Sequence, residues 1–245
     1  MTRLLDLRSV SLSSGSNDRL KDITLSIQQG EKVALLGQSG SGKTTLIKVA
    51  NGTLKPTNGK VLWKGIELNK LKRRQKSEIG TLWQDLKLIT ELTVCQNVNA
   101  GALGRKNVLW ALRNIFGLID NENCRKCLQV ACLEEILMNK SISSLSGGQQ
   151  QRVAIARLVH QQSKIILADE PLSSLDPQIA NDILNLLLTK RKNSFYTFPN
   201  TCVVSLHRPD LLEGFTRAIG LKSGEIFFDI PIGNLNKTNI NKLYS

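Results

Sequence analysis

The chain has 245 residues, of which 41% are hydrophobic and 22% charged, and its formal net charge is +13. This length and composition fit one globular domain, or one domain with an inserted subdomain. No apolar run is long enough to span a bilayer, and Met1–Asp6 lacks the apolar stretch of a signal peptide. We therefore expect the chain to stay in the cytosol and to meet a membrane only through a partner.

The positive charge is compatible with nucleic acid, anionic lipid headgroups or an acidic protein as partner. The basic residues are scattered, as in residues 70–76 and 190–192, and aromatic residues are only 4% of the chain. Side chains that could stack on bases are therefore scarce. We favour a solvated basic face near a membrane over nucleic-acid binding.

Strand patterns dominate the amino-terminal third of the chain. Alternating apolar residues predict strands of a small antiparallel sheet within residues 1–30. The apolar run Lys32–Leu36 predicts a buried strand, and Thr45–Ala50 predicts a helix. A hairpin is expected around Lys64-Gly65, and a further strand at Ile79–Gln84.

The stretch Gly37–Thr44, GQSGSGKT, fits the phosphate-binding pattern G-x-x-x-x-G-K-[ST] and stands between the expected strand and helix. Its glycines let backbone N–H groups approach a polyphosphate, and the helix N-terminus adds positive charge at the same place. Lys43 can reach the outer phosphates, and Thr44 can offer its hydroxyl to Mg²⁺. The alternative is a glycine-rich turn that matches by accident, and the flanking strand and helix argue against it. The predicted nucleotide-binding residues are Gly37, Gln38, Ser39, Gly40, Ser41, Gly42, Lys43, Thr44 and Thr45.

From about residue 85 to residue 160 helical spacing replaces the strand patterns, with helices expected at Val108–Phe116 and Asn123–Met138. Within this region Leu145–Gln149, LSGGQ, opens another helix, whose N-terminus offers a second place for an anion. The alternative is a plain helix cap with Ser146 as the N-cap residue. A cap alone does not require both glycines and the glutamine. The candidate phosphate contacts here are Ser146, Gly147, Gly148 and Gln149.

Two carboxylates, Asp169 and Glu170, end the next buried strand, Lys164–Ala168. Ligands of open α/β sheets bind at that edge. Asp169 can hold Mg²⁺, and Glu170 can accept the proton of an attacking water. The alternative is an acidic turn. His207 ends the following strand, Thr201–Leu206, and although most lone histidines are structural, we expect this one to contact the γ-phosphate.

The carboxy-terminal part of the chain is expected to contain a helix around Ile183–Leu188 and a closing hairpin of Arg217–Leu221 and Glu225–Phe228. The tail, residues 232–245, is rich in Asn and Lys. We expect it to be peripheral.

Taken in order, these motifs resemble those of the ATP-binding subunit of ATP-binding-cassette (ABC) transporters across almost the whole chain. The stretch Leu145–Gln149 is highly specific for that superfamily, whereas a phosphate loop and an acidic strand end occur in many NTPases. The ordered set is Gly37–Thr44, Gln84, Leu145–Gln149, Asp169-Glu170, Ser174-Leu175-Asp176 and His207.

The resemblance implies an α/β fold, a P-loop NTPase (RecA-like) core with an antiparallel β subdomain and an inserted helical subdomain. Residues 1–245 would form a single nucleotide-binding domain, in which residues 85–160 are the helical subdomain. That subdomain would dock on a coupling helix of a membrane subunit.

The resemblance also implies a head-to-tail homodimer of cassettes with ATP and Mg²⁺ as cofactors. Each ATP would lie between the phosphate loop of one copy and Leu145–Gln149 of the other. Glu170 and His207 would be catalytic, and Thr44 and Asp169 would hold the metal. Gln84 would contact Mg²⁺ or the attacking water and link the core to the helical subdomain. Binding of ATP would close the dimer, and hydrolysis would reopen it.

A closer resemblance, to the phosphonate importer subfamily, rests on Ala100–Arg105 and on Trp110 followed by Phe116-Gly117. It implies an ATPase that drives phosphonate import from the cytoplasmic face of the inner membrane. The partners would be an integral membrane permease and a periplasmic or lipoprotein solute-binding protein, with no nucleic acid. Because a cassette does not touch the solute, import of phosphate, phosphite or an amino acid stays open. A soluble nucleic-acid-associated ABC ATPase is the less favoured alternative.

The sequence departs from the family pattern where the adenine base is commonly stacked on an aromatic residue. That place falls near Ser13, which has no aromatic neighbour in sequence. The segment after Gln84, Asp85–Leu88, is also less aromatic than is usual in the family. We therefore expect weaker stacking on the base, or stacking by another part of the chain.

Overall fold

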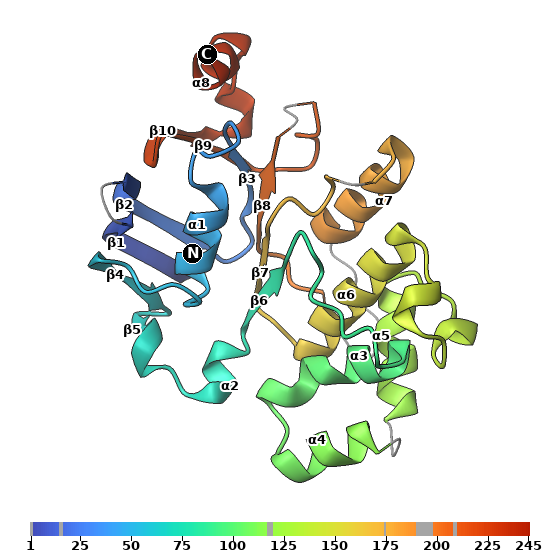
Figure 1. Cartoon of the computed structure of the whole chain (residues 1–245). Helices are drawn as coiled ribbons and strands as arrows, with labels where there is room; N and C mark the ends of the chain where they lie inside the picture. Colours follow the sequence, from blue (N-terminus) through green and yellow to red (C-terminus); the bar gives the residue numbers. More distant parts are fainter. Residues whose placement is uncertain (1, 15–16, 117–119, 174, 190–197, 208–209) are drawn as a thin grey trace. The chain divides into compact units, whose positions relative to one another are not determined.

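Figure 1 shows the computed structural model of the protein, which describes residues 2–14, 17–116, 120–173, 175–189, 198–207 and 210–245. The chain divides into two compact units, and each is described by itself. The first unit comprises Met1–Leu71, Leu167–Glu170 and Asn200–Ser245. The second comprises Lys72–Ile166 and Pro171–Pro199.

The first unit contains an antiparallel sheet with the strand order β2-β1-β4-β5. Its register pairs Leu5 with Ile27 and Leu7 with Leu25, so the buried side chains of both long strands share one face. The strands and the hairpin predicted for this part of the chain are confirmed. The strands are β1 (Arg3–Ser14), β2 (Asn17–Gln28), β4 (Asn58–Trp63) and β5 (Ile66–Glu67).

A second sheet of this unit has the order β10-β9-β3-β8, followed by the end of β7. Strand β3 pairs in parallel with both β8 and β9, and β9 and β10 form the predicted hairpin. The bounds are β3 (Lys32–Leu36), β7 (Ile165–Ala168), β8 (Cys202–Leu206), β9 (Arg217–Lys222) and β10 (Glu225–Pro231). The helices are α1 (Lys43–Ala50) and α8 (Lys237–Tyr244), with 3₁₀ turns at Leu68–Lys70 and Ile232–Asn234.

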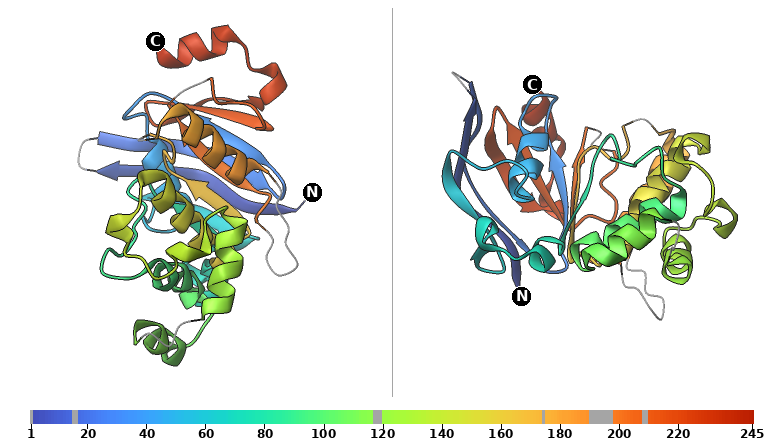
Figure 2. Two further views of the ribbon diagram at one scale, coloured as in Figure 1. Left: turned by 90° about the vertical axis from the view of Figure 1, so that its right-hand side faces the viewer. Right: turned by 60° about the horizontal axis from the view of Figure 1, so that its bottom comes forward.

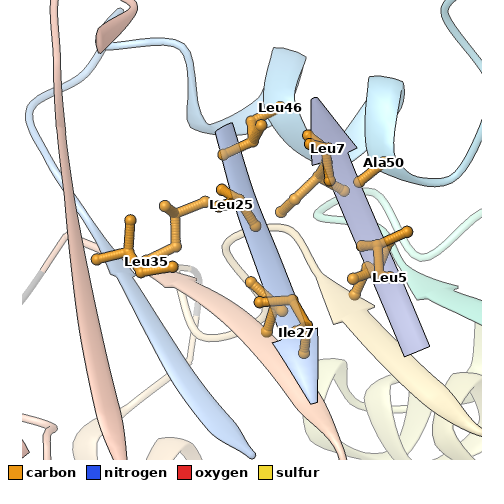
Figure 3. A pocket seen from close by; sticks show the side chains of 11 residues that line it. Leu5, Leu7, Leu25, Ile27, Leu35, Leu46 and Ala50 are labelled. Carbon is orange, nitrogen blue, oxygen red and sulfur yellow. The ribbon is translucent and has the colours of Figure 1, made fainter. Parts of the chain in front are cut away.

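Helix α1 lies beside the sheets of this unit (Figure 2), and apolar side chains of α1 and of both sheets form one core. Figure 3 shows side chains from β1, β2, β3 and α1 around one cavity of about 20 Å³. Its labelled lining residues are Leu5, Leu7, Leu25, Ile27, Leu35, Leu46 and Ala50. Burying these side chains fixes α1 against both sheets, and with it the loop that precedes α1.

The second unit is mainly helical and is built around α6 (Gly147–Gln161). The inner side of α6, including Val153, Ile155 and Leu158, is buried, and the helix packs against α3 and α5. The helices are α2 (Arg73–Lys76), α3 (Val94–Ala100), α4 (Val108–Ile115), α5 (Asn121–Val130) and α7 (Pro177–Leu188). Strand β6 (Ile79–Leu82), next to the start of β7, and 3₁₀ turns at Gly101–Gly104, Glu135–Leu137 and Ile142–Ser144 complete the unit.

The predicted helix Asn123–Met138 is wrong in length, because α5 ends at Val130. Cys132 adopts a left-handed conformation with φ of 55°, and the N–H of Leu133 donates to the carbonyl of Leu128. This is the hydrogen bond that commonly closes a helix C-terminus. The helical spacing of the apolar residues continues past the break, and so it does not reveal the break.

Among the residues that the structure describes, no helix is both long enough and apolar enough to cross a bilayer. The bounds of a helical subdomain at residues 85–160 remain a prediction.

The far end of α6 carries a buried histidine. His160 is 1% exposed, its Nδ1 lies 3.3 Å from the carbonyl oxygen of Val98, and its ring meets Trp110 edge-on at 6.3 Å. Burial lowers the pKa of His160 to about 4 from its usual 6.5. The imidazole is therefore neutral in the folded unit at pH 7.

This histidine predicts a loss of stability in mild acid. The unfolded chain takes up a proton on His160 below pH 6.5, whereas the folded chain does so only near pH 4. When the pH falls from about 7 to about 5, this difference in proton binding should lower the free energy of unfolding by about 2 kcal/mol. Urea unfolding of the protein and of His160→Gln at both pH values measures this difference. Equal pH dependence in the two proteins would contradict it.

Candidate functional site

The loop between β3 and α1 has the backbone that the phosphate-binding pattern requires. Gly37 has φ of 152° and Gly42 has φ of 108°, conformations that side chains disfavour. A Cβ atom at Gly37 would lie 2.3 Å from the carbonyl oxygen of Leu221. Ser39 and Gly40 are exposed at the tip of the loop, and Thr45 is half-buried on α1. The glycines thus let the loop fold closely over the end of β9.

Lys43 is buried beneath this loop, with 3% of its side chain exposed. Its Nζ donates to the carbonyl oxygens of Gly37 at 2.8 Å and Gln38 at 3.0 Å, and it lies 4.0 Å from Oε1 of Glu170. Burial lowers the pKa of Lys43, while the charges of Glu170 and Asp169 act in the opposite direction. The site therefore confines a cationic group at the mouth of the loop.

The buried hydroxyl of Ser41 indicates that the loop can bind a phosphate. Ser41 is 6% exposed, and its Oγ has no hydrogen-bond partner among the described residues. A buried hydroxyl without a partner is costly. A phosphate oxygen bound in the loop could accept from it, so the residues present fit a polyphosphate.

Oxygen atoms suited to a divalent cation lie at the start of α1 and the end of β7. The hydroxyl of Thr44 donates to Oδ1 of Asp169 at 3.0 Å, and the hydroxyl of Ser205 donates to the same oxygen at 3.2 Å. Burial raises the pKa of Asp169, and the hydrogen bonds from Thr44 and Ser205 lower it. Hydroxyl and carboxylate oxygens are ligands that Mg²⁺ prefers, so Thr44 and Asp169 fit this ion.

Glu170 and His207 lie side by side at the carboxyl ends of β7 and β8. Oε1 of Glu170 is 2.5 Å from Nε2 of His207. Glu170 has φ of 47°, a left-handed conformation that is uncommon for a residue with a long side chain. Its backbone N–H donates to Oγ of Ser205 at 2.8 Å. The structure thus brings together Lys43, Asp169, Glu170 and His207, as the order of the parallel strands predicts.

The tail, residues 232–245, is largely exposed, and of its residues only Leu243 is buried; in addition, α8 reaches the phosphate-binding loop, a contact that was not predicted. Nε2 of Gln38 donates to the carbonyl oxygen of Tyr244 at 2.5 Å, and the hydroxyl of Tyr244 donates to the carbonyl oxygen of His207 at 3.3 Å. Leu243 is 1% exposed, and burial raises the pKa of Tyr244. The only sequence signal for this contact is the spacing of Ile240, Leu243 and Tyr244, which is weak in so short a segment.

In the second unit, Leu145–Gln149 forms the capped N-terminus of α6. The side chain of Ser146 accepts the N–H of Gln149, and the side chain of Gln149 accepts the N–H of Ser146. The cap considered as an alternative is therefore present, and it occupies both side chains. Gly147 is exposed and Gly148 is buried, where a Cβ atom would lie 3.0 Å from the side chain of Ile179. A side chain at position 148 would therefore require the Ile179 side chain to shift by a few tenths of an ångström.

Gln84 also belongs to the second unit, where it is exposed just after β6. The loop that follows it is held by α6, since the Arg157 guanidinium donates to the carbonyl oxygens of Leu86 and Lys87 at 2.6 and 2.7 Å. Sequence reasoning gave Arg157 no role, because nothing local marks an arginine as a loop support. Asp176 caps α7, and Ser174 lies outside the described residues.

Ser205 was not predicted either, and its contacts give a direct test. It is fully buried and bridges the backbone of Glu170 and the carboxylate of Asp169. Ser205→Ala should lower the free energy of unfolding by about 1–3 kcal/mol, because a buried N–H loses its acceptor. Chemical denaturation measures this, with Ser26→Ala on β2 as the control. Equal losses in the two variants would contradict the bridging role.

Comparison with known proteins supports one family. The pattern of the family described as "ABC transporter" matches residues 20–173. The chain is similar to "Phosphonates import ATP-binding protein PhnC 1" of Nostoc sp. strain PCC 7120, at 38% identity over 99% of this chain and 92% of that protein. It is also similar to "Phosphonates import ATP-binding protein PhnC 3" of Halalkalibacterium halodurans, at 35% identity over 98% and 94% of the two chains.

A solved structure agrees with these relatives. Its title is "Dimeric structure of a post-hydrolysis state of the ATP-binding cassette MJ0796 bound to ADP and Pi", and it matches with a TM-score of 0.75 at 32% identity, covering 94% of this chain and 99% of that chain. The predicted fold class, a P-loop NTPase core with an antiparallel β subdomain and a helical subdomain, is confirmed. The chain belongs to the ABC transporter family, and within it to the ATP-binding cassettes.

Proposed function

We propose that the protein is the ATP-hydrolysing subunit of an ABC import complex that moves phosphonates through a separate membrane permease. The observation that carries the ATPase assignment is the cluster around the phosphate-binding loop. There the Lys43 ammonium, 4.0 Å from Glu170, and the Glu170–His207 pair lie at the carboxyl ends of neighbouring strands. A polyphosphate replaces the two carbonyl oxygens as the partner of Lys43.

In this proposal Thr44 and Asp169 would hold the metal ion, while a role for Gln84 at the ion stays a prediction from the sequence. When bound, Mg²⁺ neutralises charge on the β- and γ-phosphates. The contact between the Thr44 hydroxyl and Asp169 at 3.0 Å supports this assignment, since both oxygens belong to one small cluster.

Glu170 accepts the proton of the attacking water, and His207 orients the Glu170 carboxylate and contacts the γ-phosphate. The 2.5 Å separation of His207 and Glu170 supports this division of roles. The left-handed backbone at Glu170 directs its carboxylate to the same place as the Lys43 ammonium. Lys43 stabilises the charge that develops on the transferred phosphoryl group.

The phosphate contacts from Ser146, Gly147, Gly148 and Gln149 are made in trans, by a second copy of the chain. The exposed Ser146 and Gly147 at the N-terminus of α6 support this, since backbone N–H groups at helix N-termini bind anions. The dimeric cassette of known structure supports a homodimer. ATP binding closes the dimer and hydrolysis reopens it, which alternates the access of the permease.

Phosphonate import and its partners rest on the two relatives, whose names assign that solute to them. The complex contains permease subunits and a periplasmic or lipoprotein solute-binding protein, with the cassette on the cytoplasmic face of the inner membrane. The alternatives are import of phosphate, phosphite or an amino acid. A less favoured candidate, motivated by the net charge of +13, is an ATPase associated with nucleic acid.

Removing the proposed base tests the catalytic site. Glu170→Gln should retain ATP, remain as a closed dimer and lose at least about 10²-fold in turnover, since the amide cannot take a proton. Phosphate release and gel filtration with ATP and Mg²⁺ measure both effects. Glu122→Gln, at a side chain 74% exposed, is the control that should retain normal turnover. Normal hydrolysis by Glu170→Gln would overturn the assignment.

Mixing two inactive variants tests the head-to-tail arrangement. Lys43→Ala removes the loop cation, and Ser146→Arg blocks the N-terminus of α6. In a mixed dimer one of the two sites combines an intact loop with an intact α6. Random pairing makes about half of the dimers mixed, so roughly a quarter of full ATPase activity should return. Mixing Lys43→Ala with Thr44→Ala should restore nothing. Equal outcomes for the two mixtures would contradict sites shared between copies.

Transport tests the solute. The cassette, reconstituted with its permease and solute-binding protein, should drive ATP-dependent uptake of a labelled alkylphosphonate, and Glu170→Gln should abolish that uptake. Competition by excess phosphate, phosphite or amino acid alone would reassign the solute. Purification with RNA rather than with a permease would support the nucleic-acid candidate instead.

A further inference from the structure

One face of α4 carries exposed apolar side chains. Val108 and Leu109 are each 67% exposed, Leu112 is 45% exposed, and Phe116, the residue that caps the helix, is 78% exposed. These four residues are called the α4 apolar face. Helical spacing places them on one side of the helix, so they form a continuous patch and not scattered single residues. Patches of this kind mark interaction surfaces.

The opposite side of α4 is anchored to its own unit, which fixes the direction of the apolar face. The side chain of Asn107 caps the helix by accepting the N–H of Trp110. Trp110 packs edge-on against His160, and Asn114, 5% exposed, exchanges two hydrogen bonds with Gln96. Figure 1 shows α4 at the lower edge of the second unit, beneath α3. Trp110 and Asn114 thus point inward, and the α4 apolar face points outward.

The segment that carries this face has charged residues of one sign only. Residues 92–119 contain no Asp or Glu, whereas Arg105, Lys106 and Arg113 are basic. The ammonium of Lys106 lies 6.0 Å from the centre of the Trp110 ring, beside the start of α4. The basic helix α2 is joined to the segment before α4, because the guanidinium of Arg73 donates to the carbonyl oxygen of Leu103. A helix with an apolar face and basic flanks is the pattern that lies in a lipid–water interface.

We propose that the α4 apolar face and its basic flanks dock on the headgroups of an anionic membrane surface. Lys106 and Arg113 contact the headgroups, and Leu109, Leu112 and Phe116 enter the boundary with the acyl chains. A second copy of the chain is a poor occupant, since its α4 region repeats the same positive charges. The cytoplasmic loops of a permease carry an excess of Lys and Arg, so they complement this surface less well than anionic lipid does. The contact requires neither permease nor nucleotide and goes beyond the proposed function.

Flotation of the purified protein with vesicles tests the proposal. The protein should bind vesicles of phosphatidylcholine that contain about one third phosphatidylglycerol, and it should bind pure phosphatidylcholine at least ten-fold less well. Salt should weaken the binding by screening the headgroups. Absence of binding to the anionic vesicles would overturn the proposal.

Variants distinguish binding through the α4 apolar face from non-specific attraction of a cationic protein to anionic lipid. Leu109→Ser combined with Phe116→Ser should lower vesicle affinity about ten-fold or more, although the charge is unchanged. Ile136→Ser, at a side chain 77% exposed outside α4, is the matched control and should bind like the unaltered protein. Equal binding by the α4 variant and the control would overturn the proposal.

Charge reversal completes the test. Lys106→Glu combined with Arg113→Glu should weaken binding more than two reversals elsewhere in the unit, Lys126→Glu and Lys140→Glu. ATPase activity reports folding in every variant. Lipid-independent self-association abolished by the α4 changes would assign the face to a second copy. Binding only to vesicles that contain the permease would assign it to that protein. Either result would overturn the lipid contact.

Discussion

The buried ammonium of Lys43 is the charge on which the candidate site depends. It is enclosed by the loop that the glycines at positions 37 and 42 shape, and it is paired only at a distance, 4.0 Å, with Glu170. Hydrogen bonds to two backbone carbonyls hold it in place. Burying a cation is costly unless anions or hydrogen-bond acceptors compensate it. The loop carbonyls and the carboxylates at the end of β7 provide that compensation in the structure, and in the proposed function the phosphates of ATP add to it.

The first unit uses its apolar core to position this charge. Side chains of β1, β2 and β3 pack against α1, so the start of α1 lies where β3 ends. The end of β7, with Asp169 and Glu170, and the end of β8, with His207, lie at the same edge of the parallel strands. The second unit packs around α6, whose amino-terminal end at Ser146 is exposed and whose carboxy-terminal end at His160 is buried.

Much of this could be predicted from the sequence because the motifs are local. The phosphate-binding loop needs glycines at fixed spacing and a lysine after them, and a strand ending in two carboxylates is contiguous, so both can be recognised in a single stretch. Ser205 and Arg157 could not be recognised in this way. Each acts on a backbone group far away in sequence, at Glu170 and at Leu86. Contacts of this kind follow from the assembled fold, as does the contact between α8 and Gln38.

The left-handed backbone at Glu170 has a consequence for how this position can change. A residue with a side chain pays a conformational cost at φ of 47°, and glycine does not. Glycine, which relieves this cost fully, removes the carboxylate at the same time. In the proposed function turnover needs that carboxylate, so stabilised descendants of this chain would be expected to gain their thermal stability at other residues.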